Sequence, residues 1–81
     1  MPTILRHAGL RVIIWPDDHA PPHVHVFSAD GTVKIALTNA GPRLLRVTGM
    51  NRKDTAKALE LVFEHETTLL ASWEKIHGSS R

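Results

Sequence analysis

Apolar and polar residues alternate along much of the first half of the chain, and the period lengthens after residue 51. Alternation with period two is typical of strands, whose successive side chains point to opposite faces. β-Branched and aromatic residues and flanking Gly, Pro and Asp support the same interpretation. The predicted strands are LRVIIW (10–15), HVHVFS (23–28), TVKIAL (32–37) and, as a weaker fourth, RLLRVTG (43–49).

The second half of the chain has the spacing of an amphipathic helix. Large apolar residues recur three, four and seven positions apart, which predicts one helix from about Arg52 to His77. Asn51 is a suitable N-cap, and Gly78 is a suitable stop. We therefore expect a single α+β domain, 1–81, in which an antiparallel meander of three or four strands is covered on one face by a long C-terminal helix.

The predicted helix is too long for the predicted sheet. It would extend about 39 Å at 1.5 Å per residue, whereas six-residue strands span about 20 Å. One end of the helix must overhang the sheet, bend, or meet another chain; a wider or longer sheet is the alternative. Because the end of the helix remains apolar, we expect a partner-binding surface there, for a homodimer or a different protein. Its residues are Leu69, Leu70, Trp73 and Ile76.

Composition narrows the class of protein. The 81 residues include no cysteine, which excludes disulfides and thiolate metal sites and is compatible with a reducing compartment. The sequence has no apolar run of about 18 residues, so we expect no membrane association and a cytoplasmic location. The formal net charge is +2, and the basic excess lies in residues 1–50. That excess permits nucleic-acid binding without requiring it.

The segment DDHAPPHVHVF (17–27) carries the candidate chemistry. If Val24 and Val26 face the core, His23 and His25 stand together on the opposite face of their strand. Pro21 and Pro22 stiffen the chain just before this pair. The same alternation places further polar and aromatic side chains on the outer face, namely Arg11, Trp15, Phe27 and Lys34.

Three interpretations of the histidines remain open. In the first, they are structural residues. In the second, the His-x-His pair binds a divalent metal, with His19, Asp17 or Asp18 as a third ligand. In the third, they perform acid–base chemistry on RNA, for which the ordinary histidine pKa of about 6.5 is suitable. In the third case the protein is a metal-independent ribonuclease that needs no cofactor. Its catalytic residues would be His19, His23 and His25, and its substrate-binding residues Arg11, Trp15 and Lys34.

Three motifs resemble a known family: Met1-Pro2-Thr3-Ile4, the block Asp18 to His25, and Leu69-Leu70-Ala71-Ser72-Trp73. They are similar to the small bacterial family known as domain of unknown function forty-one-sixty. Its members typically carry Asp-His-x-Pro-Pro-His-φ-His after a first strand. The matched positions of that motif are Asp18, His19, Pro21, Pro22, His23 and His25. In relatives the first strand is commonly rich in Tyr or Phe, whereas this chain has no tyrosine.

The resemblance implies a genetic context more than a chemistry. Some members of the family are described as toxins of type II toxin–antitoxin pairs and are encoded beside a second small protein. We therefore expect the toxin half of such a pair, held by a cognate small antitoxin-like protein and acting on or binding RNA through its strand histidines. The alternative is a non-catalytic interaction or regulatory module, with the His-x-His pair binding a metal or merely stiffening the fold.

Overall fold

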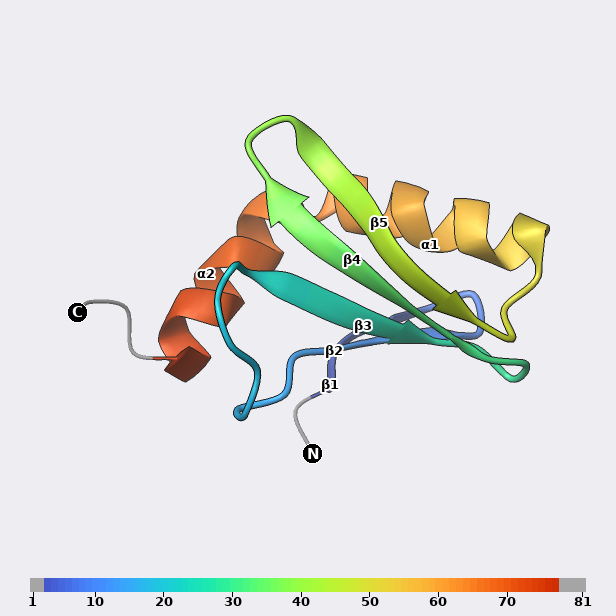
Figure 1. The fold of residues 1–81 in the computed structure, drawn as a ribbon, viewed down its shortest axis with the longest axis horizontal. Coiled ribbons are helices and arrows are strands. Elements are labelled where there is room, and N and C mark those ends of the chain that lie inside the picture. Colours follow the sequence, from blue (N-terminus) through green and yellow to red (C-terminus); the bar gives the residue numbers. More distant parts are fainter. Residues whose placement is uncertain (1–2, 78–81) are drawn as a thin grey trace.

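The computed structural model describes residues 3–77 and confirms the predicted α+β meander (Figure 1). Five antiparallel strands pair in chain order, and two helices follow them. The sheet thus has one strand more than the largest number predicted. The strands are β1 (Thr3–His7), β2 (Leu10–Ile13), β3 (His23–Phe27), β4 (Thr32–Thr38) and β5 (Gly41–Thr48), and the helices are α1 (Arg52–Glu64) and α2 (Glu66–His77).

The additional strand is β1, which forms a hairpin with β2. The two residues between the strands, Ala8 and Gly9, both have positive φ, at 51° and 81°. Two central residues with positive φ give the tight turn whose twist matches that of the flanking strands. Alanine is uncommon in this conformation, so the sequence carries no strong turn signal here and β1 was not predicted. The fourth predicted strand is present as β5.

The prediction of one uninterrupted helix is wrong, because the helix breaks at His65. The His65 backbone N–H donates to the Val62 carbonyl over 3.2 Å, and its Nδ1 lies 3.0 Å from the Leu61 carbonyl oxygen. These bonds satisfy the last carbonyls of α1, while the His65 carbonyl accepts from the Leu69 N–H and starts α2. The chain therefore changes direction at His65, and a bend was one of the alternatives that the length mismatch left open.

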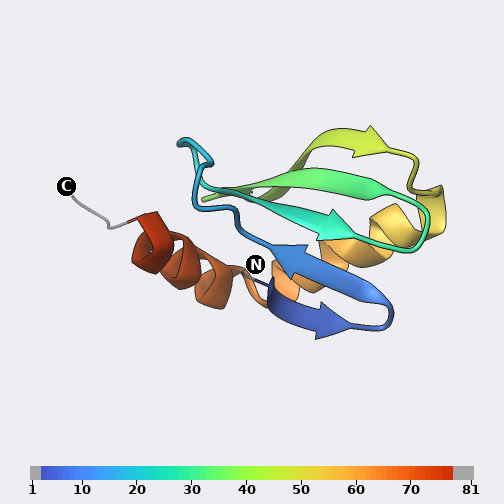
Figure 2. The same ribbon diagram turned by 90° about the horizontal axis from the view of Figure 1, so that it is seen from below.

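α1 packs on one face of the sheet, and α2 continues beyond the end of the sheet (Figure 2). The hydrophobic core is formed by the sheet together with both helices. Val24 and Val26 of β3 are fully buried there, as their alternation with the histidines predicted. The predicted N-cap is also present, because Asn51 Oδ1 accepts from the Asp54 N–H at 2.7 Å. The proposed stop at Gly78 and the Met1-Pro2 pair lie outside the described residues.

The residues predicted to bind a partner lie largely inside this core. Leu69 is 0% exposed and Trp73 is 6% exposed, while Leu70 and Ile76 are partly buried against the same cluster. The chain itself thus covers most of the apolar stripe at its helical end, so helix length gives no separate argument for a partner. Within residues 3–77, no helix is long and apolar enough to cross a membrane.

Candidate functional site

The loop between β2 and β3 holds Asp18 beside the histidine strand. The Trp15 N–H donates to Asp18 Oδ2 at 3.3 Å, and the Asp18 N–H donates to the Trp15 carbonyl at 3.1 Å. At the other end of the loop, the Pro22 carbonyl accepts from the Leu37 N–H of β4 at 2.9 Å. The Ala20–Pro21 peptide bond is cis. The loop is therefore fixed to the sheet at both ends, with one carboxylate oxygen held in place.

His23 and His25 lie side by side, as their spacing predicted. Their ring centroids are 5.3 Å apart at an interplanar angle of 74°. Asp18 Oδ2 lies 3.3 Å from the Nε2 atom of each ring. One carboxylate oxygen thus bridges two imidazoles, and Asp18, which the sequence marked only as a motif residue and one of three possible third ligands, is central to the cluster.

His23 lies on the face opposite Val24 and Val26, as predicted, but it is not accessible there. The residue is 5% exposed, and its ring centroid lies 5.2 Å from that of Trp73 on α2. The reason is the placement of α2, which runs beside the start of β3, beyond the part of the sheet that α1 covers (Figure 1). The His25 side chain keeps 21% of its exposure. His25 can therefore meet a molecule at the surface far more readily than His23.

One ring proton of His23 can be placed from its surroundings. Its Nδ1 lies 2.9 Å from the Pro21 carbonyl oxygen, which can only accept a hydrogen bond. Nδ1 must therefore carry the proton. In the neutral ring the lone pair then belongs to Nε2, the atom that faces the Asp18 carboxylate.

The surroundings of His25 favour its neutral form. Burial lowers the pKa of His25 below its ordinary value of 6.5, and this effect outweighs the opposing attraction of the Asp18 carboxylate. His25 Nε2 is buried and has no hydrogen-bond partner among residues 3–77. A neutral imidazole nitrogen and a carboxylate oxygen thus share a small buried space without a well-aligned proton between them.

The three groups together have the composition of a metal centre. The ligand atoms of Asp18, His23 and His25 all lie within 4.8 Å of one another. His19, predicted as catalytic, is exposed on the same loop and does not belong to this group. It lines a depression of about 290 Å³ beside Asp18 and His23. Of the three candidate third ligands in the sequence, the structure brings Asp18 to the histidine pair.

The cluster lies on the face of the sheet opposite the one on which α1 packs. His25 is paired across strands with Lys34, and Lys34 with Arg46. Directly paired residues point to the same side of a sheet, so these side chains form one row. Arg11 and Lys34 therefore lie on the predicted face, while Trp15, just after β2, is half-buried and contributes its backbone to the loop.

Three further arginines share this face and were not predicted as site residues. The register pairs Arg6 with Arg11 and Arg43 with Ala36, and Arg46 completes the set. Five of the ten lysines and arginines thus lie in strands, whereas none of the eight Asp and Glu residues does. The alternation of side chains along β1 and β5 could have placed these arginines on the open face. However, β1 was not recognised as a strand, and the register of β5 could not be derived from the sequence.

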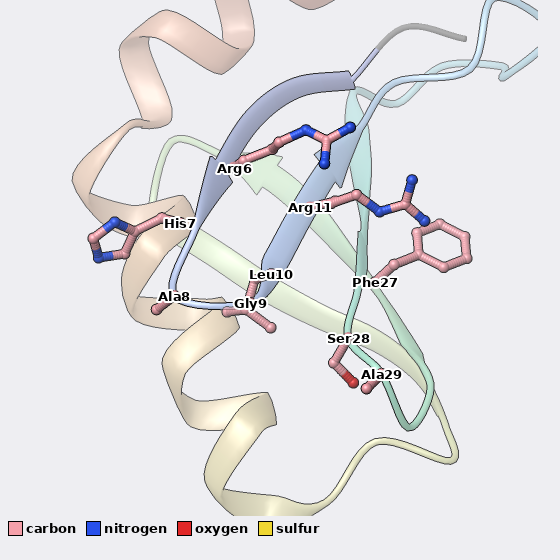
Figure 3. A pocket seen from close by; sticks show the side chains of 9 residues that line it. All are labelled: Arg6, His7, Ala8, Gly9, Leu10, Arg11, Phe27, Ser28 and Ala29. Carbon is pink, nitrogen blue, oxygen red and sulfur yellow. The ribbon is translucent and has the colours of Figure 1, made fainter.

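A depression of about 660 Å³ lies at the outer end of this face, beside the β1–β2 hairpin (Figure 3). Figure 3 shows Arg6 and Arg11 extending over the same side of the strands, with His7 pointing away from them. The Arg11 guanidinium carbon lies 5.6 Å from the centroid of the Phe27 ring. Two cations and an aromatic ring therefore border one open depression.

Fold and site together define a small α+β protein with a partly buried Asp-His-His cluster on the basic sheet face opposite α1. The chain belongs to the family described as Domain of unknown function (DUF4160), which it matches over residues 9–74. The match contains the block from Asp18 to His25 and the Leu-Leu-x-x-Trp segment. No curated protein and no solved structure matches the chain.

Proposed function

We propose that this protein binds single-stranded RNA across the open face of its sheet. The observation that carries the proposal is the segregation of charge: the strands contribute five cations and no carboxylate. Single-stranded nucleic acid is typically bound by a groove or face that combines such cations with aromatic rings on which bases stack. Arg6, Arg11 and Phe27 around one depression provide both kinds of contact.

The geometry favours binding over metal-independent cleavage. Acid–base cleavage requires two imidazoles in contact with the reacting ribose and leaving oxygen. His23 is 5% exposed and packs against Trp73, so it is not accessible to a ribose. The cations, by contrast, extend across the sheet from β1 to β5, a width of about 19 Å at the usual strand spacing. That width suits a short stretch of RNA backbone.

Charge removal on the two faces of the molecule tests the proposal. One variant carries Arg11→Gln, Lys34→Gln and Arg46→Gln on the open face. Its matched control carries Arg52→Gln, Lys53→Gln and Lys57→Gln, which are exposed residues of α1 on the opposite side. Each lowers the formal net charge of +2 by three.

Fluorescence anisotropy with a labelled RNA of about 12 nucleotides measures the affinity of each protein. The open-face variant is expected to bind at least about tenfold more weakly than the wild type, and the helix variant close to the wild type. Equal losses in the two variants would mean that net charge, and not this face, determines binding. Shortening of the RNA by the wild type would instead establish cleavage.

The toxin role is the biological part of the proposal, and the resemblance of the motifs supports it. Inducible expression in a bacterial host is expected to arrest growth. Co-expression of the small neighbouring protein that the resemblance implies is expected to relieve the arrest. The arrest should disappear with the open-face variant and persist with the helix variant if RNA binding causes it. If both variants arrest growth, the basic face does not cause the toxicity, and a non-catalytic interaction module becomes the favoured function.

A further inference from the structure

We infer that Asp18, His23 and His25 form a binding site for one divalent transition-metal ion, with zinc as the best fit. The inference is independent of RNA binding, because it concerns these three residues and not the cations around them. The distances between their ligand atoms support it. Asp18 Oδ2 lies 3.3 Å from both imidazole Nε2 atoms. Zinc bound at about 2.1 Å in tetrahedral geometry places neighbouring ligand atoms about 3.4 Å apart.

The hydrogen bonding of His23 matches that of a metal ligand. Metal-binding imidazoles usually donate their second ring N–H to a carbonyl or carboxylate, which fixes the tautomer and aims the other nitrogen at the ion. The Pro21 carbonyl performs this role, since it lies 2.9 Å from His23 Nδ1. The lone pair of the neutral His23 ring is thereby directed from Nε2 at the Asp18 carboxylate, 3.3 Å away, and a metal ion between these two acceptors would satisfy both.

His25 provides the second, independent observation. Its Nε2 is buried and finds no hydrogen-bond partner among the described residues, although Asp18 Oδ2 is only 3.3 Å away. A buried polar atom without a partner is costly, and native proteins rarely leave one. A metal ion shared with Asp18 and His23 would satisfy this nitrogen, because all three ligand atoms already lie within 4.8 Å of one another.

The donor set selects the class of metal. Two imidazole nitrogens and one carboxylate oxygen suit zinc and other first-row transition metals, whereas magnesium and calcium prefer oxygen ligands throughout. Three protein ligands leave a coordination position open, as in catalytic zinc sites. A depression of about 290 Å³ lies beside two of the ligands and is lined by Asp18, His23 and Lys34. An anionic ligand that reached the metal from this side would meet the Lys34 ammonium.

The test uses the full chain, freed of metal by a chelator, and titrates it with Zn²⁺ in a calorimeter. Absorbance of the Co²⁺-substituted protein then reports the coordination geometry. Two variants remove ligands at positions that are not deeply buried, Asp18→Asn and His25→Gln. His19→Gln is the matched control, since His19 lies on the same loop but outside the cluster. Thermal unfolding without metal confirms that each variant is folded.

The wild type is expected to bind one Zn²⁺ per chain. A hundredfold excess of Zn²⁺ over its dissociation constant should raise Tm by about 11–22 °C. Asp18→Asn and His25→Gln should each weaken binding at least about tenfold and change the Co²⁺ spectrum, and His19→Gln should do neither. Absence of binding to the folded wild type, or binding that both ligand variants retain, would overturn the inference. RNA binding measured in chelator is unaffected by that outcome, so the two proposals fail separately.

Discussion

Salt dependence gives the most quantitative test of the open sheet face. Cations that neutralise phosphates on a single strand release counterions, and the logarithm of the affinity falls with the logarithm of salt concentration with a slope of about −0.7 per contact. The face presents five such cations, namely Arg6, Arg11, Lys34, Arg43 and Arg46. If all five contact phosphates, the slope is about −3.5.

The variant with Arg11, Lys34 and Arg46 changed to glutamine keeps two of these cations, so its slope should be about −1.4. Between about 50 and 200 mM salt, the wild type should lose about a hundredfold in affinity and the variant less than about tenfold. Anisotropy titrations at four salt concentrations measure both slopes. The helix variant with Arg52, Lys53 and Lys57 changed should keep the wild-type slope. If the open-face variant also keeps it, those three residues do not contact phosphate and the argument from strand register is refuted.

Three further predictions concern stability and are read from urea unfolding. Gly31→Ala should destabilise the fold by about 3 kcal/mol or more, because the new Cβ would lie 2.5 Å from backbone atoms of Gly49 and Met50. If the variant is instead as stable as the wild type, the β3–β4 turn can move away from the new Cβ at little cost. Leu69→Ala should cost about 2–5 kcal/mol, since Leu69 is 0% exposed, whereas Phe63→Ala, at a residue 64% exposed, should cost under about 0.5 kcal/mol. Equal costs would contradict the placement of α2. Asn51→Ala should cost about 1 kcal/mol through loss of the cap on Asp54, and an unchanged midpoint would mean that water replaces it.

Much of the fold could be predicted because local patterns and the tertiary structure agree. Val24 and Val26 alternate with His23 and His25, and this alternation alone determined which side chains enter the core and which form the cluster. Asn51 likewise begins α1 through a contact three residues away, which is local enough to be read from the sequence. The family motif pointed to the same segment.

The parts that could not be predicted depend on contacts distant in the sequence or on uncommon local geometry. The burial of His23 is caused by Trp73, which the break at His65 brings to the start of β3. Nothing in the spacing of the apolar residues marks that break, because they recur at helical intervals on both sides of His65. The β1–β2 hairpin depends on Ala8 at a positive φ. Selection of Asp18 over its neighbours required the path of the loop.

The edge position of β5 has a consequence for the solubility of the molecule. Free sheet edges invite strands of other molecules, and Leu44, Leu45 and Val47 on this edge are 39–46% exposed. Pro42 lacks an N–H, the register shifts opposite Lys34 and Ile35, and two arginines interrupt the apolar run. Those arginines thus protect the edge as well as charging the face. A chain with both Arg43 and Arg46 neutralised should begin to aggregate through β5, which light scattering would detect.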